Sequence, residues 1–295
     1  MSISRQNLSI VIVTYKSEMV IHDCIKSIEK DIKIIVVENS DNSQFKEELE
    51  TTYTNVSCVL TSKNLGMGAG NNIGIKKAKT DFVLILNPDV ILEVSTINEL
   101  IIASQKILNF GILAPISSDT NYPNYKLLNN EKIQIEVKTS HKVKSVDGFA
   151  MLFNKKKLDK VILNDYFDEN FFMYLENDDL CKRINQINED IYIILNSRIK
   201  HLGGKGVNEK YKDEIELSRN WHWIWSKFYF NKKHYGYTKA FLDGLPKFIS
   251  SLIKYFFYLL IKDKIKKKIY LNRASGFFNA AKNNPSWYRP NNNND

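Results

Sequence analysis

Short apolar runs recur through the first ninety residues of the chain. They read "LSIVIVTY", "IKIIVVEN", "VSCVLTS" and "FVLILN", and segments with helical spacing or turn residues separate them. The runs are rich in Val and Ile and lack the polar alternation of a half-exposed strand, which indicates strands buried on both faces. The pattern therefore predicts an α/β, doubly wound fold, in which a mostly parallel sheet is flanked by helices.

The pattern becomes mixed between residues 95 and 210. It predicts a helix over 95–109, strands at "FGILAP", "KSVDGFAMLFN" and "DIYIIL", and a helix from near Tyr174 to Asn188. Beyond Lys210, aromatic and basic residues at helical spacing take over, as in "WHWIWSKFYFNKKHYGY". We therefore expect an α/β domain over residues 1–210 and a C-terminal helical, basic and aromatic appendage over residues 211–295. The terminal "NNNND" is expected to be unstructured.

Composition adds a charge asymmetry to this division. The 295 residues carry a net charge of +9, and residues 211–295 hold 16 Lys and Arg against 6 Asp and Glu. Three dispersed cysteines suggest neither a disulfide framework nor a zinc site. The N-terminus lacks the charged start and long apolar core of a signal peptide, so a cytoplasmic protein is expected.

The basic region contains the apolar stretch "FISSLIKYFFYLLI", residues 248–261. This stretch is shorter than the about 20 residues of a spanning helix. Lysines follow it closely, which is typical of a helix lying in an anionic membrane interface, and we expect attachment to the inner face of the plasma membrane. A helical subdomain packed on the α/β domain is the alternative. No nucleic-acid partner is expected, because no matching signature accompanies the basic residues.

Ligands of doubly wound sheets bind at the carboxyl ends of the strands. In this region, "FVLILNPDVIL" places Asp89 directly behind a proline at a strand end. The carboxylate either caps the next turn or holds a hard cation against phosphate oxygens, since Mg²⁺ and Mn²⁺ take oxygen ligands and often use only one or two carboxylates. No G-x-G-x-x-G follows the first strand, and "GGKGV" lacks P-loop spacing, so a dehydrogenase and an ATPase are both disfavoured.

Several segments together resemble family 2 glycosyltransferases, and the bacterial rhamnosyltransferase-like branch most of all. The segments that match in order and spacing are "SIVIVTYKSE", "IIVVENSDNS", "NLGMGAGNNIGIKKAKTDFVLILNPDVIL", "VDGFAMLF", "FDENFFMYLENDDLCKRI" and "RIKHLGG". The resemblance covers roughly residues 8–206 of the chain. It implies a GT-A fold and the transfer of a sugar, with inversion, from a nucleoside diphosphate to an acceptor hydroxyl.

The resemblance also implies roles for individual residues. Asp89 matches the last acid of the family's Asp-x-Asp motif, with Asn87 in place of the first acid, and His201 matches a histidine near the diphosphate. Asp89 and His201 would therefore hold Mn²⁺ or Mg²⁺. The residues expected to bind the donor are Thr14, Tyr15, Glu38, Asn64, Gly66, Asn71, Asn72, Asn87 and Asp89.

The acids at 176 to 179 lie at a predicted helix start. Acids are favoured there by the helix dipole, and Asp179 can pair with Arg183 at i, i+4. An inverting transferase also needs a base for the acceptor proton. The family has an acid where this chain has Asn177, and a neutral amide cannot take a proton. We therefore expect Glu176 to be the base and Asp179 to organise it through Arg183.

Two hypotheses about function follow from these features. The first is a membrane-associated enzyme of bacterial surface polysaccharide synthesis, with a nucleoside diphosphate sugar as donor, rhamnose as the first guess and a glycan or lipid-linked glycan as acceptor. The second is a non-catalytic module that binds nucleotide sugars or membrane surfaces, because acids are missing at Asn87 and Asn177. Turnover distinguishes the two.

Overall fold

The protein is described here by a computed structural model that covers residues 2–119, 121, 123–128, 139–162, 165–203 and 212–289. The chain divides into two compact units. Residues 1–168 and 177–207 form the sheet unit, and residues 169–176 and 208–295 form the helical unit. The "NNNND" terminus and the last glycine of "HLGG" lie outside the described residues.

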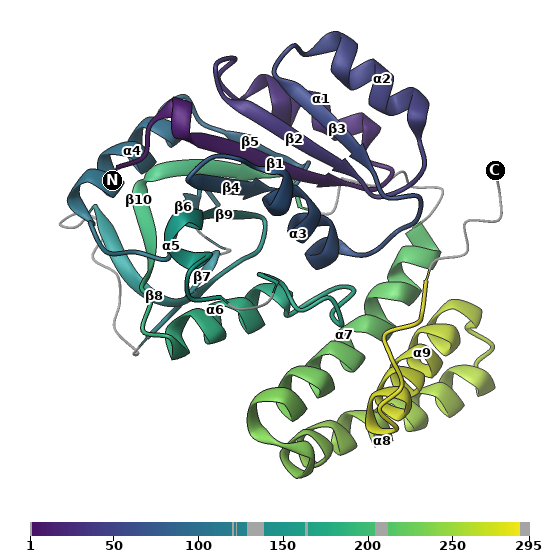
Figure 1. Ribbon diagram of the computed structural model, residues 1–295. Helices are drawn as coiled ribbons and strands as arrows, with labels where there is room; N and C mark the ends of the chain where they lie inside the picture. The colour runs from purple at the N-terminus through teal and green to yellow at the C-terminus, as the bar shows by residue number, and fades with distance from the viewer. Residues whose placement is uncertain are drawn as a thin grey trace. The chain divides into compact units, whose positions relative to one another are not determined.

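One sheet organises the sheet unit (Figure 1). Its strands pair in the order β3-β2-β1-β4-β9-β6-β10-β8-β7, and β5 pairs with β10. The pairs among β1 to β4 and between β6 and β10 are parallel, whereas β9 runs antiparallel to β4 and β6. The strands are β1 (Leu8–Thr14), β2 (Lys33–Glu38), β3 (Val56–Leu60), β4 (Phe82–Leu86), β5 (Val90–Leu92), β6 (Ile112–Ser117), β7 (Tyr125–Leu127), β8 (Ser140–Val146), β9 (Ala150–Phe153) and β10 (Ile191–His201).

Helices cover both faces of this sheet. Successive residues of β1 alternate between two cores: Ile10 and Ile12 belong to one, and Val11 and Val13 to the other. The first core includes side chains of α1 (Glu18–Lys26), α2 (Ser43–Thr52) and α4 (Thr96–Lys106), and the second includes those of α3 (Met67–Lys77), α5 (Lys155–Leu158) and α6 (Glu176–Gln186). The predicted doubly wound, mostly parallel fold is confirmed.

Two predicted elements differ in detail from the structure. The single strand expected over "KSVDGFAMLFN" is two strands, β8 and β9, because the chain turns at Gly148 and Phe149. The helix expected from near Tyr174 begins at Glu176, because Tyr174 and Leu175 adopt left-handed φ values of 71° and 67°. A residue in that conformation cannot continue a right-handed helix.

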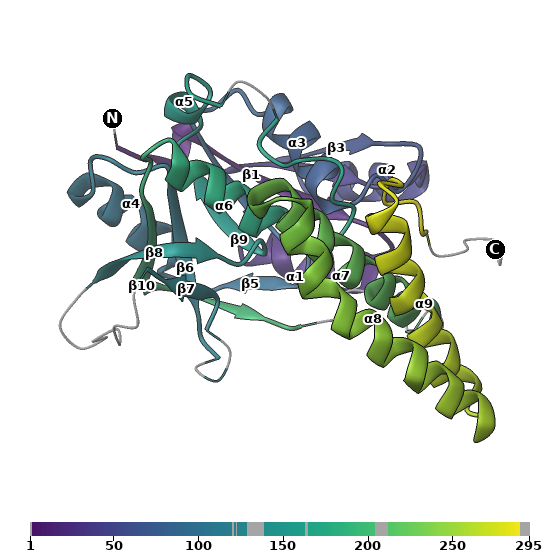
Figure 2. The same cartoon turned by 90° about the horizontal axis from the view of Figure 1, so that it is seen from below.

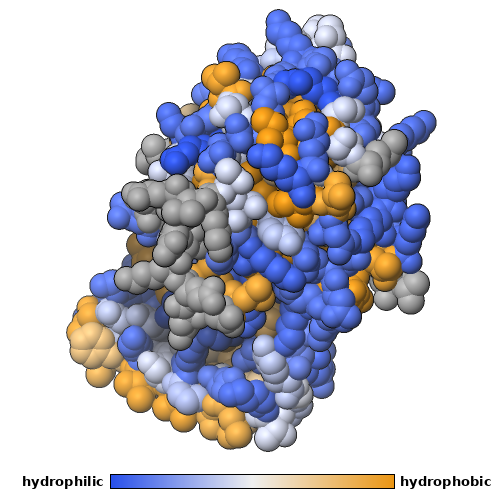
Figure 3. All heavy atoms as spheres, turned by 90° about the vertical axis from the view of Figure 1, so that its left-hand side faces the viewer, coloured by the Kyte–Doolittle hydropathy of each residue, from blue (hydrophilic) through white to orange (hydrophobic). Residues whose placement is uncertain are grey.

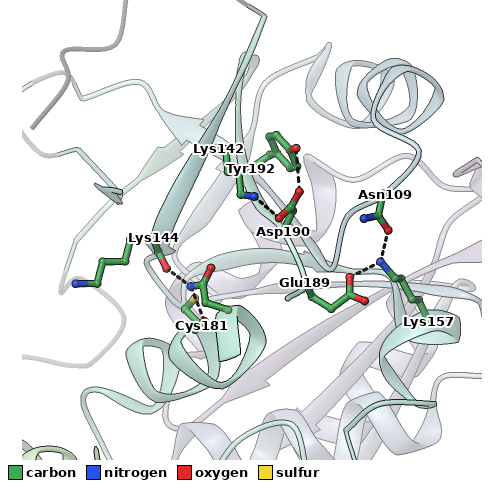
Figure 4. Close-up of polar contacts among 9 residues, drawn as sticks. Asn109, Lys142, Lys144, Lys157, Cys181, Glu189, Asp190 and Tyr192 are labelled. Carbon is green, nitrogen blue, oxygen red and sulfur yellow. Dashed lines mark hydrogen bonds and ion pairs between the residues drawn. The ribbon is translucent and has the colours of Figure 1, made fainter. Parts of the chain in front are cut away.

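Polar contacts fix the chain where it enters β10 (Figure 4). Lys157 of α5 pairs with Glu189, and Lys142 of β8 pairs with Asp190. Further along α6, the Nδ2 atom of Asn185 donates to the carbonyl oxygen of Lys144 at 2.8 Å. The pairs at Glu189 and Asp190 lie at the start of β10, so they anchor the strand whose far end carries His201.

The helical unit contains α7 (Lys212–Tyr235), α8 (Tyr237–Leu260) and α9 (Lys264–Ala281). Figures 1 and 2 show α8 and α9 side by side as a hairpin. Trp221, Phe228 and Phe277 lie in the core of the helical unit. The segment 169–176 packs on α7, where Ser226 Oγ donates to the carbonyl oxygen of Met173 at 2.7 Å. Among the residues described in this structure, no helix combines the length and apolar character needed to cross a membrane.

Candidate active site

The carboxyl ends of β1 and β2 bring Thr14 and Glu38 together. The two residues are partners in the parallel register. The Thr14 hydroxyl donates to Oε2 of Glu38, and the Ser40 hydroxyl donates to Oε1 at 2.5 Å. Glu38 is 1% exposed, and this burial raises the pKa of its carboxyl although both hydroxyls oppose the shift. Each carboxylate oxygen keeps a further lone pair for a ligand donor.

Asn39 connects this strand end to the loop before α3. Its Nδ2 atom donates to Oδ1 of Asn64 and to the carbonyl oxygen of Gly66, both at 3.1 Å. Asn64 Oδ1 in turn accepts from the Gly66 amide at 3.0 Å. Asn64 and Gly66 are thus held beside the end of β2, where Glu38 lies. Asn39 was not among the predicted donor-binding residues, and its position directly after β2 was the signal for it.

Glycine is needed at three positions in and before α3, for different structural reasons. Gly66 adopts φ 89°, a conformation that favours glycine, and serves as the N-cap of α3. A Cβ added to Gly70 would lie 2.7 Å from Cγ1 of Val13, and one added to Gly74 would lie 2.3 Å from Cγ1 of Val11. The glycines at 70 and 74 therefore allow α3 to pack closely against β1.

Asn71 and Asn72 in the first half of α3 differ in their surroundings. Asn72 Nδ2 donates to the carbonyl oxygen of Phe167 at 2.8 Å, and its Oδ1 accepts from the Phe167 amide at 2.9 Å. This pair of bonds holds the chain after β9 and α5 against α3. Asn71 is 3% exposed, and its Oδ1 has no hydrogen-bond partner among the described residues. A buried acceptor without a donor lowers the stability of the fold. Of the two asparagines, Asn71 is therefore the one whose side-chain oxygen can accept a hydrogen bond from a ligand.

Asp89 and His201 lie together at the ends of β4 and β10. The antiparallel pairing of β5 with β10 places His201 opposite Val90, and the Leu202 amide donates to the carbonyl oxygen of Asp89 at 3.0 Å. This register brings His201 Nε2 to 3.4 Å from Asp89 Oδ1. The His201 ring stacks on Phe149 with 4.2 Å between ring centroids. Asp89 itself is 7% exposed, so both side chains are held in place by their surroundings.

These two side chains fit a divalent cation that takes its other ligands from outside the protein. A carboxylate oxygen and an imidazole nitrogen suit Mn²⁺, and the carboxylate suits Mg²⁺. Within the described ranges, no group of three or more His, Cys, Asp or Glu side chains forms a metal site by itself. A cation held by Asp89 and His201 would therefore need further oxygen ligands from a bound molecule or from water.

A third group of charges surrounds the turn between β8 and β9. Burial raises the pKa of the Asp147 carboxyl; Asp178 adds to the shift, while Lys126 and His201 oppose it. Lys126 Nζ donates to both carboxylate oxygens of Asp178, at 2.7 and 2.8 Å. Asp147 and Lys126 were not predicted as site residues. "VDG" marked Asp147, but nothing in the sequence marked Lys126, which reaches the group from β7.

The acids at the start of α6 separate into distinct environments. Asp179 is fully buried, and Arg183 Nε donates to its Oδ2 at 2.9 Å, so the predicted i, i+4 pair is present. Asn177 Nδ2 donates to the carbonyl oxygen of Val146 at 2.9 Å, which ties α6 to the end of β8. Glu176 is the first residue of α6 and belongs to the helical unit.

Known proteins resemble this chain in sequence and in fold. The model of the family described as "Glycosyl transferase family 2" matches residues 9–162, just over half of the chain. The chain belongs to glycosyl transferase family 2. The low-salt glycan biosynthesis hexosyltransferase Agl10 of Haloferax volcanii is 27% identical over 211 residues, 63% of this chain. The match covers 64% of that relative, just under two thirds of its length.

Solved structures with the same fold include that of GalNAc-T7 with UDP, GalNAc and Mn²⁺. It has a TM-score of 0.56 at 15% identity, over 82% of this chain and 57% of that one. S. aureus TarS 1–349 has a TM-score of 0.51 at 14% identity, over 96% of this chain and 93% of that one, and was also solved with UDP and with UDP-GlcNAc. These likenesses confirm the predicted GT-A fold.

Proposed function

We propose that this protein transfers a sugar from a nucleoside diphosphate to a hydroxyl group of an acceptor. The observation that carries the proposal is the Asp89 and His201 pair, which lies at a strand end in the same sheet as the Thr14 and Glu38 pair. In a member of glycosyl transferase family 2, these groups suit the two parts of one donor. The hydroxyl, carboxyl and amide groups around Glu38 suit a nucleoside, and the Asp89 and His201 pair suits a cation bound to a diphosphate.

On the donor side, Thr14, Tyr15, Glu38, Asn64 and Gly66 would border the nucleoside. Asn71, which has an unused buried acceptor, Asn72 and Asn87 would line the rest of the pocket. Asp89 and His201 would hold Mn²⁺ or Mg²⁺, and the cation would neutralise charge that develops on the departing diphosphate. Holding the donor by its nucleoside and its diphosphate fixes the anomeric carbon for attack.

On the acceptor side, Glu176 is the proposed general base. Its carboxylate would take the proton of the acceptor hydroxyl while the oxygen of that hydroxyl forms the bond to the anomeric carbon and the diphosphate leaves from the opposite face. This sequence of bonds inverts the configuration. The left-handed Tyr174 and Leu175 directly before Glu176 support the assignment, because a strained backbone of about 1–3 kcal/mol per residue is typical of functional sites. Asp179 is a positioning residue, since it is buried against Arg183.

The identity of the sugar is a separate proposal. The resemblance of the sequence favours rhamnose from dTDP-rhamnose, while the relative in Haloferax volcanii is named a hexosyltransferase and the TarS structure was solved with UDP-GlcNAc. We propose a hexose or deoxyhexose donor, and a glycan or lipid-linked glycan acceptor of the cell surface.

A donor panel tests this function and distinguishes it from the non-catalytic alternative. The purified chain is heated with Mn²⁺ and each of dTDP-rhamnose, UDP-glucose, UDP-GlcNAc and UDP-GalNAc, and a bound donor raises the melting temperature by mass action. Donors that bind are then incubated with glycan and lipid-linked acceptors, and the release of the nucleoside diphosphate is measured. Acceptor-dependent release supports the enzyme. Tight binding without release with every acceptor supports a binding module, and no binding of any nucleotide sugar overturns both.

A further inference from the structure

Helix α8 carries an apolar face along most of its length. Its large apolar side chains that are at least 48% exposed are Leu242, Ile249, Ile253, Phe256, Phe257 and Leu260. At about 100° per residue, these six positions fall within an arc of about 100°. Scattered apolar residues are ordinary on a protein surface, but a continuous face of this kind is typical of an interaction site.

The opposite face of α8 is already packed. Ala240 and Ser251 are 1% and 5% exposed and face the other helices of the unit. Gly244 lies against Phe277 of α9, because a Cβ added there would come within 2.5 Å of that ring. The apolar face therefore does not belong to the interior of the helical unit. Hydrophobic side chains gather along the lower rim of the surface in Figure 3, over this unit.

Lysines surround the C-terminal end of this face. Lys254 lies on α8, and the turn and first residues of α9 add Lys262, Lys264, Lys266, Lys267 and Lys268. The acid in this stretch, Asp263, is the N-cap of α9 and accepts from the Lys266 amide at 2.9 Å. An exposed apolar face next to a cluster of lysines is complementary to a partner with an apolar interior and a negatively charged surface.

We propose that α8 lies in the plane of an anionic phospholipid surface, with its apolar face in the boundary between headgroups and acyl chains and the lysines on the lipid phosphates. This mode fits a helix with one polar and one apolar face. The sequence predicted an interfacial helix only over residues 248–261, whereas the structure extends the face back to Leu242. The inference goes beyond the proposed function, since binding to lipid is measured without turnover.

Charge favours a lipid surface over a second copy of the chain. A dimer that covers this face would bring a further set of the same lysines near the interface, and like charges repel. Anionic lipids attract each lysine near the surface, and the attraction is worth about a fivefold change in binding per lysine.

Flotation of the full chain with vesicles tests the proposal. We expect binding to vesicles that contain phosphatidylglycerol, weaker binding to pure phosphatidylcholine, and weakening by salt because the charge attraction is screened within about 8 Å at physiological ionic strength. The triple variant Ile253→Ser, Phe256→Ser, Leu260→Ser should lose at least tenfold in binding. The matched control is Val94→Ser with Leu108→Ser, two exposed apolar residues of the sheet unit, which should bind like the parent.

A second pair of variants isolates the charge. Replacing Lys264, Lys266, Lys267 and Lys268 with Gln should weaken binding to phosphatidylglycerol vesicles by at least tenfold. The control with the same loss of charge replaces Lys30, Lys33, Lys77 and Lys79, which are exposed in the sheet unit, and should change binding little. Circular dichroism checks that each variant is folded. The proposal is overturned if the parent does not float with these vesicles, if both quadruple variants lose binding equally, or if the serine variant only abolishes a dimer seen by analytical ultracentrifugation.

Discussion

His201 approaches Asp89 with its Nε2 atom 3.4 Å from the Oδ1 atom of the carboxylate, although 112 positions separate the two residues in the chain. The antiparallel pairing of β5 with the end of β10 produces this approach. The sequence contains a single acid here, since Asn87 stands where a second carboxylate would strengthen cation binding. In the proposed metal site, His201 from a distant strand would supply the second donor.

The first prediction follows from this pair. Asp89→Asn keeps the size of the side chain and removes its charge, so Mn²⁺-dependent donor binding should weaken by about tenfold or more, because the cation loses a charged ligand. Isothermal titration of the donor at limiting and saturating Mn²⁺ measures the change. Asp31→Asn, at an exposed carboxylate of the same unit, is the control. Equal donor affinity of parent and Asp89→Asn at both Mn²⁺ concentrations would contradict the proposed role.

The second prediction concerns the base. Glu176→Gln keeps the shape and hydrogen bonding of the side chain but removes proton acceptance, so transfer should fall by about 10²- to 10⁴-fold with donor affinity nearly unchanged. Single-turnover transfer and donor titration measure the two quantities separately. If Glu176→Gln transfers sugar at near the parent rate while Asp147→Asn or Asp178→Asn does not, the base is one of the acids beside β8 instead.

The third prediction concerns the stability that Asp179 and Asp178 contribute to the fold. Asp179 is fully buried against Arg183, whereas Asp178 pairs with Lys126, whose side chain is 58% exposed. Asp179→Asn should lower the free energy of unfolding by about 1–3 kcal/mol, because it leaves a partly buried guanidinium without its charged partner. Asp178→Asn should lower it by less than about 1 kcal/mol, because the partner that it leaves, Lys126, is exposed to water. Denaturant unfolding checks both, and equal losses would contradict the difference in burial.

Local patterns in the sequence were sufficient for the strands of the fold. β1, β2 and β4 are buried on both faces, and their unbroken apolar runs reveal this directly. The turn between β8 and β9 was not predicted, because the residues on both sides of it are apolar and suit one continuous strand as well as two. The start of α6 was misplaced by two residues, since nothing in "MYLEN" marks left-handed conformations at Tyr174 and Leu175.

The ends of the strands located part of the candidate site. Thr14 and Glu38 are the last residues of β1 and β2, and Asp89 follows β4, so parallel pairing brings all three to one edge of the sheet. Lys126 comes from β7, a short strand at the far side of the sheet, and only the tertiary pairing brings it to Asp178. Side-chain contacts of this kind depend on the order of the strands, which local spacing does not contain.

The last prediction is a loss of stability of the helical unit in mild acid, caused by His222. This side chain is fully buried on α7, with Nε2 2.6 Å from the carbonyl oxygen of Tyr288 and Nδ1 3.0 Å from the hydroxyl of Ser286. Its pKa is lowered from 6.5 to about 4: burial is the largest cause, the bond to Tyr288 opposes the shift, and the nearby Arg289 adds to it. Between pH 6.5 and about 4, His222 therefore binds a proton in the unfolded chain but not in the folded chain.

The contribution of His222 to stability is complete above pH 6.5 and is lost as the pH falls toward 4, at up to about 1.4 kcal/mol per pH unit. The measurement is denaturant unfolding at pH 7, 6, 5 and 4, followed by tryptophan fluorescence, because Trp221, Trp223, Trp225 and Trp287 all lie in the helical unit. His222→Gln should be less stable at pH 7 but should lose less stability between pH 7 and 4, and carboxylates that titrate in this range act on both proteins and cancel in the comparison. Equal losses in parent and variant would show that His222 is not the group whose protonation loosens this unit.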